Sequence, residues 1–140
     1  PNILRLAFPS SRKKIKMLAK EEIRELLDVV TNAWVEWIVG MGQHSQIYIH
    51  TTPHFCTNFK ASVNEIANRT EAIFLYYDFN NTIDEDMFFL ANALEKNLWI
   101  ITRDGFSNHV RDLSEEIFSA IEDRNWATPK WNRNTNTIEF

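Results

Sequence analysis

Hydrophobic residues recur along this chain with two periods, one typical of amphipathic helices and one typical of buried strands. Between residues 20 and 39 the apolar side chains fall three or four positions apart, which is the spacing of one helix face. They are Ile23, Leu26, Leu27, Val30, Ala33, Trp34, Trp37 and Ile38. Gly40 and Gly42 follow and act as stop signals for a helix. The pattern predicts a long helix over about residues 20–39, with both tryptophans in the core.

Four short runs rich in apolar residues predict strands. They are residues 3–8 (ILRLAF), 46–50 (QIYIH), 72–77 (AIFLYY) and 98–102 (LWIIT). AIFLYY is nearly continuous in apolar residues, which fits a strand that is buried on both faces of a parallel sheet. A single helix separates AIFLYY from LWIIT, so a right-handed crossover would make them adjacent, parallel, central strands.

Three further helices and a final strand complete the pattern. One helix covers about residues 58–68, and another follows Thr82, ends at Asn97 and carries Met87, Leu90, Ala91 and Leu94 on one stripe. A third follows Ser114, and residues 137–140 are expected to form an edge strand. This alternation predicts a three-layer α/β domain with a mainly parallel central sheet. We expect residues 1–140 to be a single domain and a fragment of a longer chain.

Composition narrows the class of protein. Hydrophobic residues make up 44% of the 140 residues, which is typical of a globular chain. No apolar stretch approaches the length of a membrane span, so no membrane partner is expected. The net charge of −4 is not the broad basic signature of a nucleic-acid-binding protein. The local basic run at residues 12–16 (RKKIK) is compatible with phosphate contacts, although a solvated helix start explains it more simply.

The single cysteine, Cys56, cannot form an intrachain disulfide, which favours a reducing, intracellular compartment. Mitochondrial and nuclear locations both stay open. His50 and His54 lie close to Cys56 in sequence, which raises the alternative of a thiol or metal site. A packed, inert thiol is the favoured interpretation, because free cysteine is usually buried.

Acidic residues cluster where the helix after Thr82 begins, and another acid follows the next strand. Asp84, Glu85 and Asp86 open the helix, and Asp104 follows LWIIT. In open α/β sheets, sites form outside the carboxyl ends of the strands. Several acidic oxygens there would suit Mg²⁺ or Mn²⁺. Asp86 borders the apolar stripe of the helix and is expected to face the sheet, whereas Asp84 lies toward solvent.

A purely structural interpretation fits the same acids. Thr82 and Glu85 have the spacing of a capping box, with Thr82 as N-cap. Asp84 and Asp86 would complement the positive end of the helix dipole, and Asp104 would begin a turn. The dinucleotide-binding, P-loop and nucleophile-elbow motifs are all absent from the sequence.

Residues 85–90 (EDMFFL) pair two acids at an aromatic-rich helix start, residues 102–104 (TRD) end the next strand, and His109 follows. This order resembles the metallonuclease domain of protein-only ribonuclease P, in the NYN branch of PIN-like nucleases. Residues 107–109 keep only the His of that family's Arg-Asp-His triplet, and residues 131–140 loosely match its closing Trp and edge strand. Two features depart from the family: Glu85 replaces an Asp, and ILRLAFPS lacks the metal-binding Asp of the first strand.

The resemblance implies a PIN/NYN-like fold and a metal-dependent endoribonuclease that cleaves precursor tRNA at its 5′ end. It implies Mg²⁺ or Mn²⁺ held by Glu85, Asp86 and Asp104, with Asp86, Asp104 and His109 in catalytic roles. Arg103 and His109 would contact RNA, although a surface ion pair for Arg103 and a plain surface His109 are alternatives. The Asp86 and Asp104 carboxylates are expected to lie about 4–8 Å apart, close enough to share one hydrated cation.

Two other functions fit the chain. A degenerate, non-catalytic module of the same fold would bind RNA or a protein partner and would use its acids only as caps. The missing first-strand acid and the negative charge favour that hypothesis. A receiver-like signalling domain is weaker, because it would rest on Asp78 after AIFLYY alone.

Overall fold

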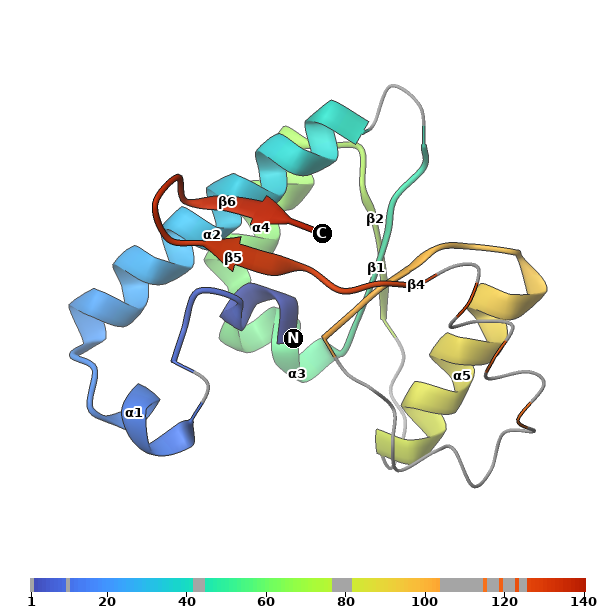
Figure 1. The fold of residues 1–140 in the computed structure, drawn as a ribbon, viewed down its shortest axis with the longest axis horizontal. Coiled ribbons are helices and arrows are strands. Elements are labelled where there is room, and N and C mark those ends of the chain that lie inside the picture. The colour runs from blue at the N-terminus through green and yellow to red at the C-terminus, as the bar shows by residue number, and fades with distance from the viewer. Residues whose placement is uncertain are drawn as a thin grey trace. The chain divides into compact units, whose positions relative to one another are not determined.

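The computed structural model describes residues 2–9, 11–41, 45–76, 82–103 and 126–140, and positions 115, 119 and 123; at 2, 3, 76 and 82–85 it describes the backbone alone. The chain divides into two compact units (Figure 1). Unit 1 contains residues 1–76 and 130–139, and unit 2 contains residues 77–129 and Phe140. Within the described residues, no helix is long and apolar enough to cross a membrane.

The long helix α2 (Lys20–Met41) is the main support of unit 1. Its buried residues are Val30, Thr31, Ala33, Trp34, Val35 and Ile38, which confirms the predicted apolar face along its second half. Trp34 packs edge-to-face on Trp37, with ring centroids 5.7 Å apart and planes at 86°. That geometry is favourable for aromatic pairs and makes both tryptophans part of the packing rather than a ligand platform.

The N-terminal run ILRLAF is not the strand that its apolar continuity predicted. It begins as the 3-10 helix η1 (Asn2–Arg5), which contacts α2, and Phe8 N–H donates to the Arg5 carbonyl at 3.0 Å. The segment buries Leu4, Leu6, Ala7 and Phe8. A six-residue run is too short to reveal its period, so it does not distinguish a strand from a buried turn. The short helix α1 (Arg12–Lys16) follows.

Strand β1 (Tyr48–Thr51) pairs in parallel with β2 (Ile73–Tyr76), with Tyr48 opposite Ile73 and Thr51 opposite Tyr76. Two helices connect the strands, α3 (Pro53–Asn58) and α4 (Lys60–Arg69), and α4 packs against α2. The helix expected over about residues 58–68 is confirmed as α4, whereas α3 before it was not predicted. Thr52 is the N-cap of α3, its hydroxyl accepts from Phe55 N–H at 3.2 Å, and Pro53 occupies the first helical turn.

In unit 2 the helix α5 (Thr82–Glu95) packs against strand β3 (Ile100–Ile101), which pairs in parallel with β4 (Trp126–Ala127). Leu90, Ala93 and Ile100 form the buried cluster, and Phe89, Leu98 and Trp126 pack around it. The buried face of α5 differs from the predicted stripe, because two of the residues in that stripe, Ala91 and Leu94, are exposed. The helix also includes Thr82, which was expected to cap it from outside.

The C-terminal segment forms a hairpin of β5 (Lys130–Asn132) and β6 (Thr137–Glu139), and β6 contacts α2. This confirms the final strand, and it adds a partner strand that was not predicted. Asn136 has a positive φ of 52° in the hairpin turn, a conformation that asparagine tolerates better than most residues.

The described strands form three two-stranded sheets, of which two are parallel and one is antiparallel. The α/β class is confirmed. AIFLYY and LWIIT contribute to β2 and β3, which belong to different units, so their predicted pairing stays a prediction, as does the three-layer PIN/NYN-like arrangement. Of the helix expected after Ser114, Glu115, Ser119 and Asp123 are helical.

Candidate functional site

Asp86 lies in the second turn of α5, on the side of the helix that meets the strand. It is spaced four and seven positions before Leu90 and Ala93, so the three residues share one face of the helix. Leu90 and Ala93 are buried against Ile100 of β3, and Asp86 itself is half-buried. The structure thus confirms that Asp86 borders the apolar face of α5.

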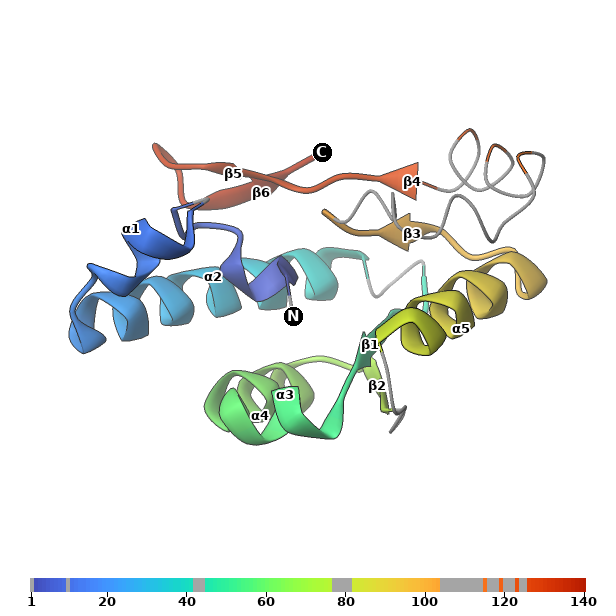
Figure 2. The same ribbon diagram turned by 90° about the horizontal axis from the view of Figure 1, so that it is seen from below.

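A tight turn reverses the chain between α5 and β3. Asn97 has a φ of 52°, its N–H donates to the Leu94 carbonyl at 3.2 Å, and Leu98 N–H donates to the Ala93 carbonyl at 2.8 Å. These two hydrogen bonds define a Schellman motif, with Leu98 packing beside Ala93 as such motifs favour. The turn therefore sends β3 back along α5, and Figure 2 shows the two elements running in opposite directions.

The lengths of α5 and β3 determine which of their residues lie at the same distance from the Schellman turn. From Glu95 back to Asp86, the helix covers about 13 Å at its usual rise per residue. From Leu98 forward to Thr102, an extended chain also covers about 13 Å. Asp86 and Thr102 therefore lie at about the same distance from the Schellman turn. A half-buried carboxylate is brought level with the carboxyl end of β3.

The end of β3 is fixed by its neighbour. Thr102 N–H donates to the Ala127 carbonyl of β4 at 3.2 Å, and Arg103 is exposed directly after it. No ion pair joins Arg103 to any described residue. The alternative in which Arg103 forms a surface ion pair is therefore not supported by these residues. Asp104 and His109 lie outside the described residues, and so does Asp78. Of Glu85 and Asp84 only the backbone is described, and the expected distance between Asp86 and Asp104 stays a prediction.

Among the described residues, no group of three or more His, Cys, Asp or Glu side chains is arranged to hold a metal ion. This argues against a metal site formed by Cys56 with His50 and His54. Cys56 is a free, half-buried thiol, and the exposed His54 hydrogen-bonds through Nε2 to Asn58 Nδ2 at 2.9 Å. Both observations favour the packed-thiol interpretation.

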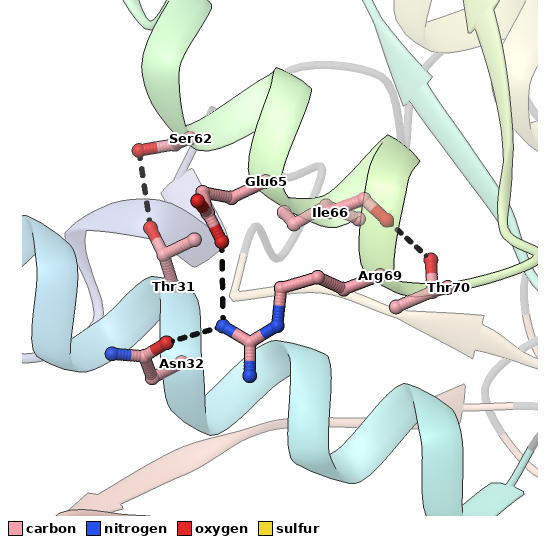
Figure 3. Close-up of polar contacts among 7 residues, drawn as sticks. All are labelled: Thr31, Asn32, Ser62, Glu65, Ile66, Arg69 and Thr70. Carbon is pink, nitrogen blue, oxygen red and sulfur yellow. Dashed lines mark hydrogen bonds and ion pairs between the residues drawn. The ribbon is translucent and has the colours of Figure 1, made fainter.

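A polar network between α2 and α4 was not anticipated from the sequence (Figure 3). The buried Thr31 hydroxyl donates to Ser62 Oγ at 3.1 Å. Arg69 Nη1 donates to Asn32 Oδ1 at 2.6 Å and lies 3.4 Å from Glu65 Oε2. The network joins the helices and holds no general base beside a hydroxyl, so its chemistry is structural. In the sequence, only the polar residues Thr31 and Asn32 of α2 pointed to this network.

An open groove of about 700 Å³ lies in unit 1, where the last turns of α2 and α4 approach the start of β1. Ile38 and Val39 line one part, and Gln46, Arg69 and Glu71 line another. Gln46 Nε2 donates to the backbone carbonyls of Ile47 and Glu71, at 3.3 and 3.2 Å. The polar groups thus stabilise the chain at this point, and no catalytic arrangement is present in the groove.

Comparison of this chain with protein-family models, with curated proteins and with solved structures found no match in any of the three. Functional inference therefore rests on the residues and on the geometry of α5 and β3.

Proposed function

We propose that this chain is a metal-dependent endoribonuclease domain of the protein-only ribonuclease P type, acting on the 5′ end of precursor tRNA. The observation that carries the proposal is the reversal between α5 and β3, which brings the half-buried Asp86 level with the strand end that Asp104 follows. A carboxylate on a helix and another after the adjacent strand can supply oxygen ligands to one shared cation. The motif order over residues 82–109 supplies the substrate class.

The donor set fits a hard divalent cation. Asp86 and Asp104 would hold Mg²⁺ or Mn²⁺, with Glu85 as a further ligand, because carboxylate oxygens suit both ions. Such a cation, when bound, supplies an activated water and stabilises phosphate oxygens. Arg103 is exposed at the strand end, where its guanidinium would steady the RNA strand. His109 would contact a phosphate oxygen or orient the attacking water.

A second candidate function, a non-catalytic module that binds RNA or a protein partner, is favoured by one specific observation. The N-terminal run ILRLAF forms η1 rather than a strand, and no acid follows it. The strand-end carboxylate that the family places there has no counterpart in this segment. Under this hypothesis the acids of α5 serve the helix dipole only.

The deciding experiment compares two Asp→Asn substitutions in a precursor tRNA cleavage assay with Mg²⁺ or Mn²⁺. We expect Asp104→Asn to lower the cleavage rate by about 100-fold or more, since mutating even the outer partners of a metal site typically costs 10- to 100-fold. Asp84→Asn is the matched control, because it removes the same charge from an acid assigned to solvent. It should leave the rate within about twofold.

Metal binding separates the two candidate functions. We expect Mn²⁺ to bind the parent chain in a titration followed by electron paramagnetic resonance, and Asp86→Asn to weaken that binding. A parent chain that neither binds Mn²⁺ nor cleaves would leave the non-catalytic module as the function. Equal cleavage by the parent and by Asp104→Asn would place the reaction at another site or in a contaminant.

A further inference from the structure

Residues 12–20, hereafter the basic segment, have a charge opposite to that of the rest of the chain. Arg12, Lys13, Lys14, Lys16 and Lys20 lie within nine positions that contain no acid. The chain has 15 Lys and Arg against 19 Asp and Glu, so the remaining residues hold ten cations against 19 acids, a net charge of −9. A local charge of +5 on so acidic a protein creates a positive potential that attracts an anionic partner.

The charges of the basic segment are available to a partner. All five cationic side chains are exposed, and no ion pair joins any of them to a described residue. The nearest acids in sequence are Glu21, Glu22 and Glu25, which are also exposed and lie in the first turns of α2. Glu21 and Glu22 there complement the helix dipole of α2.

The backbone that presents these charges is ordered by specific contacts. Ser11 is the N-cap of α1, and its hydroxyl accepts from Lys14 N–H at 3.2 Å. Leu18 N–H donates to the Ile15 carbonyl at 3.1 Å after the helix ends, and both side chains are half-buried. The cations therefore project from a fixed scaffold, which lowers the conformational entropy lost when a partner binds.

Helical spacing gathers three of the cations. Lys13 and Lys16 lie three positions apart, and Arg12 and Lys16 lie four apart, so Lys16 is a helix-face neighbour of each, with Cβ atoms about 5–6 Å apart in each pair. Long side chains at that spacing can contact neighbouring phosphates of one strand. Arg12 adds a planar guanidinium that binds a phosphate through two hydrogen bonds.

We propose that the basic segment binds the phosphate backbone of an RNA strand. The charges of the basic segment indicate a polyanionic ligand. That this ligand is RNA rests on the proposed nuclease function. An anionic membrane fits less well, because interfacial helices need a broad apolar face. Here α1 has five residues, and Met17, 78% exposed, is the one large, strongly exposed apolar side chain of the segment.

The test measures binding of the full chain to a fluorescently labelled single-stranded RNA in EDTA, by anisotropy at several salt concentrations. The variant carries Arg12→Gln, Lys13→Gln and Lys16→Gln. The matched control carries Lys60→Gln, Lys130→Gln and Arg133→Gln, which removes the same charge from exposed positions elsewhere in unit 1. Circular dichroism checks that both variants are folded.

We expect the basic-segment variant to lower affinity about tenfold or more near 0.1 M salt and to reduce the salt slope by about 2 units, because each phosphate contact contributes about 0.7. The control should change the slope by less than one unit. Equal losses in both variants, no loss in either, or binding to phosphatidylserine vesicles in place of RNA would each overturn the proposal. Because EDTA removes the metal, binding can persist when cleavage fails, and the failure of either proposal can be recognised separately.

Discussion

The Thr31–Ser62 hydroxyl pair is the residue-scale contact that ties α2 to α4 inside the core. Both residues are about 3% exposed, and the hydroxyls lie 3.1 Å apart. A buried hydroxyl is costly unless it is hydrogen-bonded, so each residue depends on the other. The pair therefore specifies which turn of α4 meets which turn of α2, a role that apolar packing alone performs less selectively.

We expect Ser62→Ala to destabilise the protein by about 1–3 kcal/mol, because Thr31 would lose its partner inside the core. Adding Thr31→Val should recover part of that loss, since both polar groups are then removed. Urea unfolding of the parent, both single variants and the double variant gives the coupling energy. Strictly additive single effects would mean that the hydrogen bond contributes little.

At the scale of elements, the packing of α5 on β3 follows from a small number of side chains. Leu90 and Ile100 are each 1% exposed, whereas Leu94 is 39% exposed on the same helix. The Schellman turn at Asn97 fixes the direction of return, and the buried cluster fixes the rotation of α5 about its axis. Both features together set the side of α5 on which Asp86 lies relative to β3.

Leu90→Ala should cost about 2–5 kcal/mol, since it leaves a cavity against Ile100. Leu94→Ala is the control, with the same chemical change at an exposed position, and it should cost less than about 1 kcal/mol. Urea denaturation followed by far-ultraviolet circular dichroism would measure both losses. Similar losses for the two variants would contradict the burial pattern of α5.

Elements with a long, regular pattern were predictable, and short ones were not. The helix over residues 20–39 was found as α2 because its apolar face repeats over about four turns. ILRLAF was assigned to the wrong conformation because a six-residue run fits a strand and a buried turn equally well. The strand β4, two residues long, gave no periodic signal, since its place depends on pairing with distant Ile100 and Ile101.

The candidate site was predictable to a similar degree. The position of Asp86 next to the buried face of α5 follows from its spacing to Leu90, a local property of one helix. Asp104 and His109, the groups expected to join it, lie outside the described residues, so their approach to Asp86 stays a prediction. The hydrogen bonds between α2 and α4 were missed because they join residues more than 30 positions apart.

At the scale of the whole molecule, the two compact units should respond separately to core mutations. Ile38→Ala in α2 should speed amide hydrogen exchange mainly in unit 1, and Leu90→Ala mainly in unit 2, because local opening follows cooperative units. Exchange followed by mass spectrometry on peptides from α4 and α5 measures this. Equal acceleration in both peptides by either variant would show one cooperative unit instead.

The hairpin β5–β6 belongs to unit 1 but is encoded after residues 77–129 of unit 2. A ribosome adds residues at about 5–20 per second from the N-terminus, so α2 is made long before the strand β6 that contacts it. Until residues 130–139 leave the exit tunnel, part of the α2 surface has no cover. The nascent chain is therefore expected to need chaperone protection late in its translation, and ribosomes stalled within unit 2 should display the most chaperone-accessible form of unit 1.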